Sequence, residues 1–464
     1  MPRFFLQNFG CRATQADGAA IVRQLEERGL APSDSPAHAD IVILNTCTVT
    51  EAADHDARAA VRRVHRENPD ARILVTGCYA QRAPEEVAAL SGVTWVVGNS
   101  HKHMVPEIAS GADGNFVSVE RLSLSSPAFT LTGDIFAHTE LIAAPVISGE
   151  PSEGRTRPNL KVQDGCNNRC SFCIIPSVRG QSRSLPLDRV IQEANALVSA
   201  GYKEIVLSGI NLGRWGLDFA SQQRFVQLLE ALLAQTEIQK IRISSVEPMD
   251  WSDDLIALVA GCRRIAKHAH LPLQSGSDRI LRLMHRKYRP WHYAEKVRKI
   301  REAMPDAAIG ADVMVGFPGE TDELFEESRD FIARLPFTYL HVFTYSSRPG
   351  TPSASMPNQV PVHLARERNR VLRELAAEKN LAFRRTFIGN TLQVITLNDG
   401  DMDPTEALSG NYLKVSIAGR YPANESFAVR IGAITKEGLR GSPVCNEAVS
   451  PPAEQPILAE TGML

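Results

Sequence analysis

Residues 160–176 read LKVQDGCNNRCSFCIIP, an apolar strand followed directly by three closely spaced cysteines. Cys166, Cys170 and Cys173 have the spacing C-x3-C-x2-C, so their thiolates can converge on one metal centre. A structural zinc site normally takes four protein ligands, and this segment offers neither a fourth cysteine nor a histidine. Three thiolates on a [4Fe–4S] cluster instead leave one iron open. The pattern therefore favours an iron–sulfur cluster over structural zinc or unconnected cysteines.

This strand is the first of six in the middle of the chain, and a helical pattern follows each of the first five. The predicted strands are Leu160–Gln163, Glu204–Ser208, Lys240–Ser244, His268–Leu273, Ile309–Gly316 and Tyr339–Tyr345. Six strand–helix units are typical of a partial (β/α)6 barrel, in which the chemistry lies at the carboxyl ends of the strands. We expect this barrel to span residues 156–375, with the three cysteines at its active end.

Three more cysteines each follow an apolar strand near the start of the chain. They are Cys11, Cys47 and Cys78, after the strands at residues 4–6, 41–44 and 73–76. Short apolar strands that alternate with helices predict a Rossmann-like parallel α/β domain, here over residues 1–125. If these strands are neighbours, the three thiols meet at one edge of the sheet and form a second three-thiolate site. Buried structural cysteines are the alternative.

The remaining segments complete an α/β fold class with a small all-β module. We expect a linker at 126–155, a small β domain at 376–440 and a disordered tail at 441–464. The 464 residues suit two or three domains, and the net charge of −2 neither suggests nor excludes a nucleic-acid partner. The chain shows neither a signal peptide nor an apolar run of membrane-spanning length, so we expect a cytoplasmic monomer with no membrane partner.

The sequence around the loop cysteines resembles the methylthiotransferases of the radical S-adenosylmethionine superfamily, from Gln163 through Pro176 and on to Arg183. The three N-terminal cysteines match that family's auxiliary-cluster ligands, and the β domain resembles its TRAM barrel. The resemblance implies two [4Fe–4S] clusters and two molecules of S-adenosylmethionine per turnover. It also implies that Cys166, Cys170 and Cys173 carry the catalytic cluster.

Five stretches resemble one branch of this family, namely Asn45–Thr50, Ser182–Ser184, Ser244–Pro248, Met284–Tyr288 and Asp312–Glu320. That branch adds a methylthio group to carbon 2 of N6-threonylcarbamoyladenosine at position 37 of tRNA. After Cys11 the chain departs from the branch pattern with Arg-Ala-Thr-Gln. The alternatives are methylthiolation of isopentenyladenosine in tRNA or of a ribosomal-protein aspartate, and a non-enzymatic metal- and RNA-binding protein.

The resemblance and the barrel topology imply a set of S-adenosylmethionine contacts at or near the strand ends. They are Phe172, Ser208, Gly209, Ser244, Ser245, Glu247, Gln274, Ser275 and Gly316. Ordinary turn and capping roles are the alternative for these residues.

A basic and aromatic run suggests where RNA binds. It consists of Arg286, Lys287, Tyr288 and Arg289. Cationic side chains neutralise phosphates, and an aromatic ring can stack on an unpaired anticodon-loop base. A solvated helix face is the alternative. The expected partners are the anticodon stem-loop of tRNA and a low-potential electron donor such as flavodoxin or ferredoxin.

Overall fold

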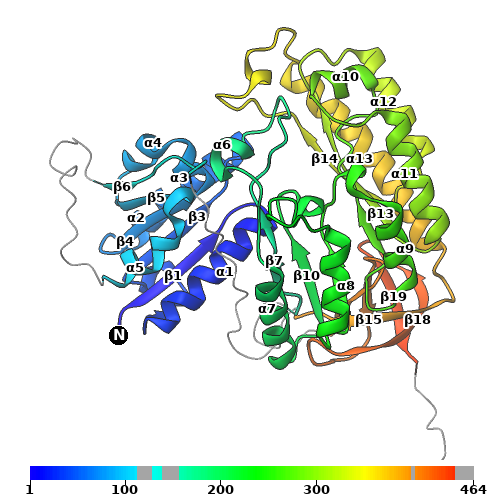
Figure 1. Cartoon of the computed structure of the whole chain (residues 1–464), viewed down its shortest axis with the longest axis horizontal. Helices are drawn as coiled ribbons and strands as arrows, with labels where there is room; N and C mark the ends of the chain where they lie inside the picture. Colours follow the sequence, from blue (N-terminus) through cyan, green and yellow to red (C-terminus); the bar gives the residue numbers. More distant parts are fainter. Residues whose placement is uncertain (112–127, 138–155, 399–402, 445–464) are drawn as a thin grey trace, which may run out of the picture.

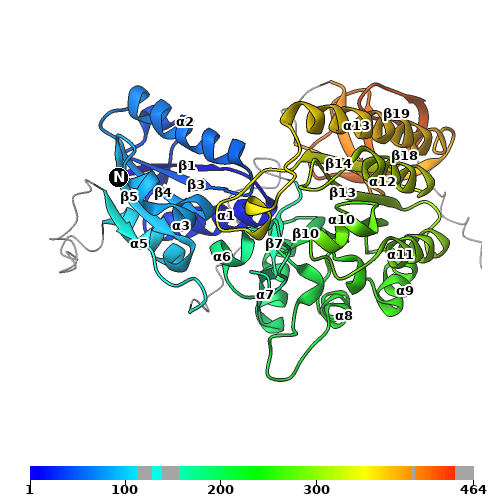
Figure 2. The same cartoon turned by 90° about the horizontal axis from the view of Figure 1, so that it is seen from above.

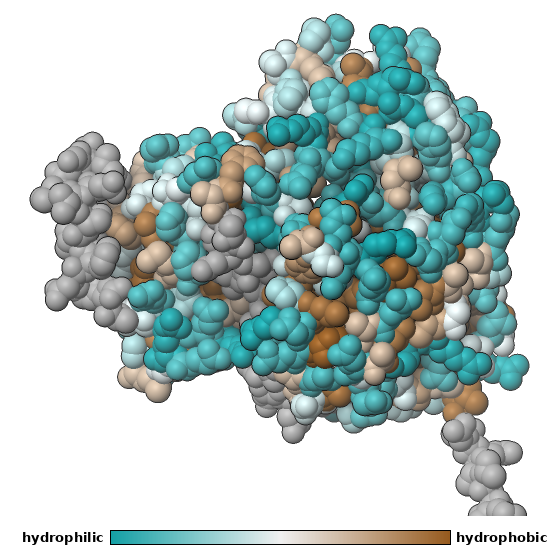
Figure 3. Space-filling view, in the orientation of Figure 1, coloured by the Kyte–Doolittle hydropathy of each residue, from teal (hydrophilic) through white to brown (hydrophobic). Residues whose placement is uncertain are grey.

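The computed structural model describes residues 1–111, 128–137, 156–398 and 403–444. The N-terminal domain lies beside the central domain, and the C-terminal barrel packs against the central domain from below in the view of Figure 1. Figure 2 shows the same three parts from above. On the face drawn in Figure 3 the surface is mostly hydrophilic, with hydrophobic side chains gathered mainly over the central domain. None of the described helices is long and apolar enough to cross a membrane.

The N-terminal domain is built on a six-stranded parallel sheet of order β2-β1-β3-β4-β5-β6. Its strands are β1 (Arg3–Asn8), β2 (Ala31–Pro32), β3 (Ile41–Thr46), β4 (Arg72–Gly77), β5 (Val93–Gly98) and β6 (Phe129–Leu131). The helices are α1 (Arg12–Glu27), α2 (Glu51–Glu67), α3 (Cys78–Arg82), α4 (Pro84–Ala88) and α5 (Val105–Ser110).

Both faces of this sheet are covered, which explains the continuous apolar run of β3. Val42 and Leu44 join the cluster that includes residues of α2, whereas Ile41 and Ile43 join the cluster that includes residues of α1 and α5. A strand buried on both faces reads as an unbroken apolar segment rather than an alternating one. The Rossmann-like expectation is therefore confirmed.

The short strand β6 extends this sheet into the segment expected to be a linker. It pairs in parallel with β5, Trp95 opposite Phe129. With only three residues it lacks the apolar run that marks β3, so the sequence pattern gave no sign of it. Residues 138–155 of the expected linker lie outside the described part of the chain.

The central domain holds two three-stranded parallel sheets, ordered β11-β10-β7 and β12-β13-β14. The strands are β7 (Asn159–Lys161), β10 (Glu204–Ser208), β11 (Lys240–Ile243), β12 (His268–His270), β13 (Ala308–Val315) and β14 (Tyr339–Thr344). Parallel bridges from Ile241 to Ile265 and from Ser245 to His270 connect the two sheets. The six strands thus form one open, curved wall, as expected for a partial (β/α)6 barrel.

Helices cover the outer face of this wall. They are α7 (Leu187–Ser199), α8 (Phe225–Gln235), α9 (Asp253–Gly261), α10 (Asp278–Leu283), α11 (Pro290–Ala303), α12 (Asp322–Arg334) and α13 (Val362–Arg385). The main hydrophobic core lies between these helices and the strands and includes Ala269, Leu271 and Val313. Side chains alternate along a strand. His270, between Ala269 and Leu271, and Asp312, between Ala311 and Val313, therefore face the opposite, concave side of the wall.

The first predicted strand of the barrel is split. The pairing with β10 ends near Lys161, and Gln163–Asp164 (β8) pairs antiparallel with Arg183–Ser184 (β9). The loop between β8 and β9 carries the three closely spaced cysteines and the short helix α6 (Ile175–Arg179). This extra pairing holds the two ends of the cysteine loop together.

The C-terminal domain is a closed five-stranded barrel of order β15-β16-β17-β19-β18. Its strands are β15 (Thr391–Thr396), β16 (Thr405–Ser409), β17 (Lys414–Ile417), β18 (Ser426–Ile434) and β19 (Leu439–Pro443). The sequence pattern predicted β15, β17 and β18 only, because TEALS and LRGSP lack clear alternation. Strand β19 ends within the expected tail, and residues 445–464 lie outside the described part.

A turn of the C-terminal barrel covers the bottom of the central barrel. Tyr412 stacks on His268 with a centroid distance of 4.7 Å and lies tilted against Tyr339 at 5.4 Å, and the guanidinium of Arg242 lies 5.5 Å from its ring centre. Arg242 also donates to the carbonyl of Ser409 at 3.0 Å. His268 and Tyr339 begin β12 and β14, so Tyr412 covers the end opposite the cysteine loop.

Candidate functional site

The cysteine loop is held by backbone contacts that require glycine. Cys166 donates its N–H to the carbonyl of Gly180 at 3.0 Å. Gly165 has φ +69°, and a Cβ there would lie 1.9 Å from the carbonyl oxygen of Gln181. Only glycine adopts this conformation without strain and also leaves room for the opposite strand. The spacing Asp-Gly-Cys therefore fixes where Cys166 points.

Hydrogen-bond donors surround the sulfurs of this loop. Cys166 Sγ accepts from the backbone N–H of Asn168 at 3.4 Å and from Asn211 Nδ2 at 3.6 Å. Cys170 Sγ accepts from Arg286 Nη1 at 3.1 Å. Burial raises the pKa of Cys173 to about 12, so its free thiolate is disfavoured without a compensating cation. Three converging thiols with donors aimed at two of the sulfurs fit an anionic iron–sulfur cluster.

The N-terminal cysteines meet at one edge of the first sheet. Strands β1, β3 and β4 are direct neighbours in register, and Cys11, Cys47 and Cys78 follow them. Burial, together with the nearby Cys78 and Cys11, raises the pKa of Cys47 to about 12. Gly10 lies so close that a Cβ on it would be 2.7 Å from Cys47 Sγ. Cys11, Cys47 and Cys78 thus follow three neighbouring strands, and their joint binding of one cluster stays a prediction.

Replacing Gly10 with alanine should empty the N-terminal site selectively. The new Cβ would lie 2.5 Å from Cys47 Cβ, and φ of +94° strains any L-residue there. We expect iron to fall from about eight to about four per chain, with S-adenosylmethionine cleavage retained. Iron and sulfide analysis after anaerobic reconstitution measures this. Gly111→Ala is the control, because Gly111 also has positive φ but no atom of the described residues lies within 4 Å of the added Cβ. Equal iron in both variants contradicts the prediction.

Helix α6 connects the two cysteine groups. Its residue Val178 packs with Cys78 and Ile174 in one buried apolar cluster. The side chain of Asn99, at the start of η2 (Asn99–Met104), donates to Cys78 Sγ at 3.4 Å and to the carbonyl of Val178 at 2.7 Å. In Figure 1, α6 lies directly beside α3, which begins at Cys78. The two sites therefore share one wall.

A buried ion network joins the N-terminal and central domains behind this wall. Asp17 of α1 accepts from Lys102 Nζ at 2.9 Å, from Lys161 and from Arg179 Nη2 at 3.1 Å. Asp164 accepts from Arg179 Nη1 at 3.0 Å and from Lys161 at 3.1 Å. All five residues are buried. Burial raises the pKa of Asp17, but the three cations outweigh it and hold that pKa well below its usual range.

This network leaves one positive charge in excess, since three cations face two carboxylates. Arg179 Nη2 also donates to Thr14 Oγ1 at 3.3 Å, and this oxygen lies 3.5 Å from Cys11 Sγ, so Arg179 is linked to the N-terminal cysteines through Thr14. A net cation beside the N-terminal cysteines suits an anionic cluster. The sequence pattern missed Asp17, Lys102 and Lys161, whose positions along the chain show no common spacing.

A second contact ties the open end of β14 to the segment after Cys47. Arg348 donates to Thr48 Oγ1 at 2.8 Å and pairs with Asp54, and both partners also bind Arg82. Thr48 directly follows Cys47, and Arg348 lies four residues beyond β14. The segment that follows β14 is therefore held beside the segment that follows Cys47.

Comparisons with known proteins agree with this geometry. Residues 160–332 match the family model of the radical SAM superfamily, and residues 3–98 match that of uncharacterized protein family UPF0004. The chain is 37% identical over 451 residues to threonylcarbamoyladenosine tRNA methylthiotransferase MtaB of Bacillus subtilis, covering 91% of this chain and 95% of the relative. It belongs to the radical SAM methylthiotransferase family.

Two further relatives place this methylthiotransferase within the family. The MtaB protein of Aquifex aeolicus is 35% identical, over 89% of this chain and 96% of its own. A tRNA-2-methylthio-N(6)-dimethylallyladenosine synthase of Acetivibrio thermocellus is 34% identical, over 84% and 80%. Among solved structures, the radical S-adenosylmethionine methyltransferase TsrM of Kitasatospora setae shares the fold with a TM-score of 0.56, 15% identity and coverage of 76% and 75%. The family uses S-adenosylmethionine and [4Fe–4S] clusters.

Some expected S-adenosylmethionine contacts of this methylthiotransferase carry buried polar atoms that have no hydrogen-bond partner among the described residues. Ser208 Oγ ends β10, and Gln274 Oε1 follows β12 with φ +65°. Asn211 Oδ1, which the sequence did not indicate, is likewise unpaired while its Nδ2 bonds Cys166. A buried oxygen without a donor is costly, so these atoms are suited to a polar cofactor. Gly209 adds room here, since a Cβ would lie 2.9 Å from Gln163 Oε1.

The other expected contacts have partners in the protein. Ser245 Oγ bonds His270 Nδ1 at 2.7 Å, Glu247 pairs with Arg286, and Ser275 Oγ accepts from the N–H of Ser277 at 3.2 Å. The backbone of Ser244 donates to Leu207 at 3.1 Å. These four residues remain candidates for S-adenosylmethionine contacts because they lie at or near the ends of the strands.

Gly316 and Phe172 have evident packing roles. Gly316 has φ +76°, and a Cβ on it would lie 2.5 Å from Cβ of Ala365 in α13. Phe172 packs edge-on against Phe317, with ring centres 6.4 Å apart. Both residues hold the upper end of the barrel together, whether or not they also touch a cofactor.

A cleft opens beside Cys170. It has about 320 Å³ of empty space, counting its open mouth, and its walls include Asn168, Arg214, Glu247 and Lys287. The charged groups on both sides suit a zwitterionic ligand with an amino and a carboxylate group.

The expectation of RNA contact is wrong for Arg286 and Tyr288. Arg286 is 7% exposed and bonds Cys170 and Glu247, and Tyr288 is 1% exposed with its hydroxyl on the carbonyl of Leu273 at 2.7 Å. The segment is not a helix face, because α10 ends at Leu283 and α11 begins at Pro290. The intervening loop turns alternate residues inward.

The two other basic residues of this run differ from each other. Arg289 is half-buried and donates to the carbonyl of Tyr288 at 3.0 Å, so it holds the loop. Lys287 is exposed at the mouth of the cleft. Of the four predicted RNA contacts, Lys287 alone is placed to meet a phosphate directly.

Proposed function

We propose that this protein adds a methylthio group to carbon 2 of N6-threonylcarbamoyladenosine at position 37 of tRNA. The observation that carries the proposal is the pair of three-cysteine groups that share the wall made by α6. The names of the first relatives support the substrate, because they are threonylcarbamoyladenosine tRNA methylthiotransferases that match nearly the whole chain. The anticodon stem-loop is the proposed binding partner.

The loop cysteines and the N-terminal cysteines would each hold one [4Fe–4S] cluster. With S-adenosylmethionine bound, such a cluster supplies the electron that generates a radical able to remove an unactivated hydrogen. Arg286 and Asn211 donate to the sulfurs and hold their orientation. Ser208 and Gln274 offer oxygens to the polar groups of the cofactor.

The chain's other contribution is to enclose the reaction. Tyr412 covers the lower end of the barrel and excludes water from that side. Lys287 at the mouth of the cleft would contact a phosphate of the RNA, and the reactive base must leave its stack to reach the interior. A low-potential flavodoxin or ferredoxin would supply electrons.

The direct test is turnover with defined RNA. Anaerobically reconstituted protein, S-adenosylmethionine and a chemical reductant are incubated with anticodon stem-loops that carry adenosine, isopentenyladenosine or threonylcarbamoyladenosine at position 37. Mass spectrometry of the nucleosides should detect a methylthio product from the threonylcarbamoyl substrate with the highest kcat/KM. Preference for isopentenyladenosine would reject the proposed substrate. Modification of a ribosomal-protein aspartate, with all three RNAs unchanged, would reject the proposed RNA function.

A further inference from the structure

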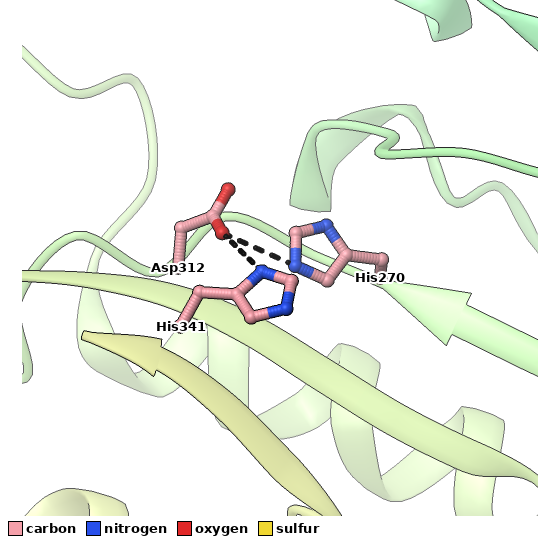
Figure 4. A group of neighbouring side chains, drawn as sticks. All are labelled: His270, Asp312 and His341. Atoms are coloured by element: carbon pink, nitrogen blue, oxygen red, sulfur yellow. Dashed lines mark hydrogen bonds and ion pairs between the residues drawn. The ribbon is translucent and has the colours of Figure 1, made fainter. Parts of the chain in front are cut away.

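Three side chains on neighbouring strands lie close together inside the central barrel, joined by a hydrogen bond and an ion-pair contact (Figure 4). His270, Asp312 and His341 come from β12, β13 and β14, and Asp312 is directly opposite His341 in the register. Asp312 Oδ1 lies 3.3 Å from His270 Nε2 and 3.2 Å from His341 Nδ1. Ser245 Oγ bonds the other nitrogen of His270 at 2.7 Å.

This group lies on the wall of the reaction chamber. Leu340 and Val342 pack against the main core, so His341 between them faces the opposite, concave side. The exposed side-chain fraction rises from 7% at His270 to 24% at Asp312 and 57% at His341. The group is therefore anchored in the wall and opens into the interior at His341.

His341 presents a polar atom to this space. Its Nδ1 is bound to Asp312, whereas none of the described residues bonds its Nε2, which Figure 4 shows turned away from the carboxylate. An imidazole held in this way offers Nε2 to a ligand, and Nε2 donates a hydrogen bond when both ring nitrogens carry a proton. The site is thus suited to an anionic oxygen.

An exposed aromatic ring follows on the same face of β14. Phe343 is two residues beyond His341, with 37% of its surface exposed. Two residues along a strand span about 6.6 Å. A purine that stacks on Phe343 would therefore place a short substituent within reach of His341.

We propose that His341, oriented by Asp312, binds the carboxylate of the threonylcarbamoyl substituent while the adenine stacks on Phe343. The inference rests on the proposed function and deepens it, since it names the residue that distinguishes an acidic substituent on N6 from an apolar one. Arg348, four residues beyond β14, bonds Thr48, which follows Cys47, so the carboxyl end of β14 lies toward the N-terminal cysteines. The sulfur-donating side and the base would thus be adjacent.

The test compares His341→Phe with His341→Gln on stem-loops that carry threonylcarbamoyladenosine or unsubstituted adenosine. Loss of a hydrogen bond to a charged group predicts that His341→Phe lowers kcat/KM for the threonylcarbamoyl substrate by about 10- to 100-fold, mainly through KM. The value for plain adenosine should change little, and His341→Gln should restore most of the selectivity. His292→Phe on the exposed side of α11 is the matched control.

Three results overturn the inference. An equal loss of kcat/KM on both RNAs means that His341 only supports the fold. Iron content and the formation of 5′-deoxyadenosine in the absence of RNA test this independently. Unchanged selectivity in His341→Phe means that another residue reads the substituent. A stoichiometric non-iron metal that is lost in both His341→Phe and Asp312→Asn means that the group is a metal site. If the wild-type protein itself shows no preference for the threonylcarbamoyl substrate, the proposed function fails instead.

Discussion

Replacement of Cys166, Cys170 and Cys173 together with alanine is expected to abolish S-adenosylmethionine cleavage and to halve the bound iron. Iron and sulfide should fall from about eight to about four per chain, because each three-cysteine group holds one four-iron cluster. Cleavage is lost entirely because the open iron next to the cleft is the proposed cofactor site. Chromatographic measurement of 5′-deoxyadenosine from dithionite-reduced protein gives the first quantity, and colorimetric iron and sulfide analysis gives the second.

The converse triple variant separates the two sites. Replacing Cys11, Cys47 and Cys78 should also halve the iron but leave S-adenosylmethionine cleavage measurable, while methylthio product disappears. Cys262→Ala is the control and should change neither quantity, since Cys262 lies at the end of α9 and packs against the main core. Cleavage that survives loss of the loop cysteines, or zinc in place of iron, would refute the assignment.

Substitution of Arg179 by methionine is expected to be the most destabilising single change at the domain boundary. It leaves Asp17 and Asp164 buried with fewer cations, and breaking a buried ion pair typically costs about 3–5 kcal/mol. The midpoint of urea unfolding, followed anaerobically on the reconstituted protein, should fall accordingly. Arg298→Met removes a pair with Glu302 in which both side chains are more than half exposed, and it should cost under about 1 kcal/mol.

The effect of Arg179→Met should depend on pH with a definite sign. The cations lower the pKa of Asp17 and Asp164 against the opposing effect of burial, so the network contributes stability above the unfolded carboxyl pKa of about 4. That contribution is lost as pH falls toward the lowered folded values. The stability difference between wild type and variant should therefore shrink below about pH 4. A difference that is constant from pH 3 to pH 7 would mean that Arg179 acts through packing alone.

Much of the architecture was predictable because continuous apolar strands and cysteine positions are local signals. Leu44 and Val75 mark strands that the structure reproduces, and Cys11, Cys47 and Cys78 follow three strands that are neighbours in the sheet, as their positions predicted. Strands β6 and β16 were missed because their stability comes from neighbours in the sheet or barrel rather than from their own pattern.

The polar contacts were less predictable because their partners are far apart in sequence. Lys102 and Lys161 meet at Asp17 across 85 and 144 positions. Arg286 looked like an RNA contact because a basic run usually lies on a solvated surface. Its guanidinium is buried against Cys170 instead, and only the loop geometry between α10 and α11 reveals this.

The packing of Tyr412 against His268 and Tyr339 limits how the chain can be truncated. The C-terminal barrel closes the lower end of the central barrel, so deleting it would expose the ring of His268 and open that end to solvent. An engineered version of the protein therefore has to keep the C-terminal barrel, because without it the lower end of the central barrel would be open.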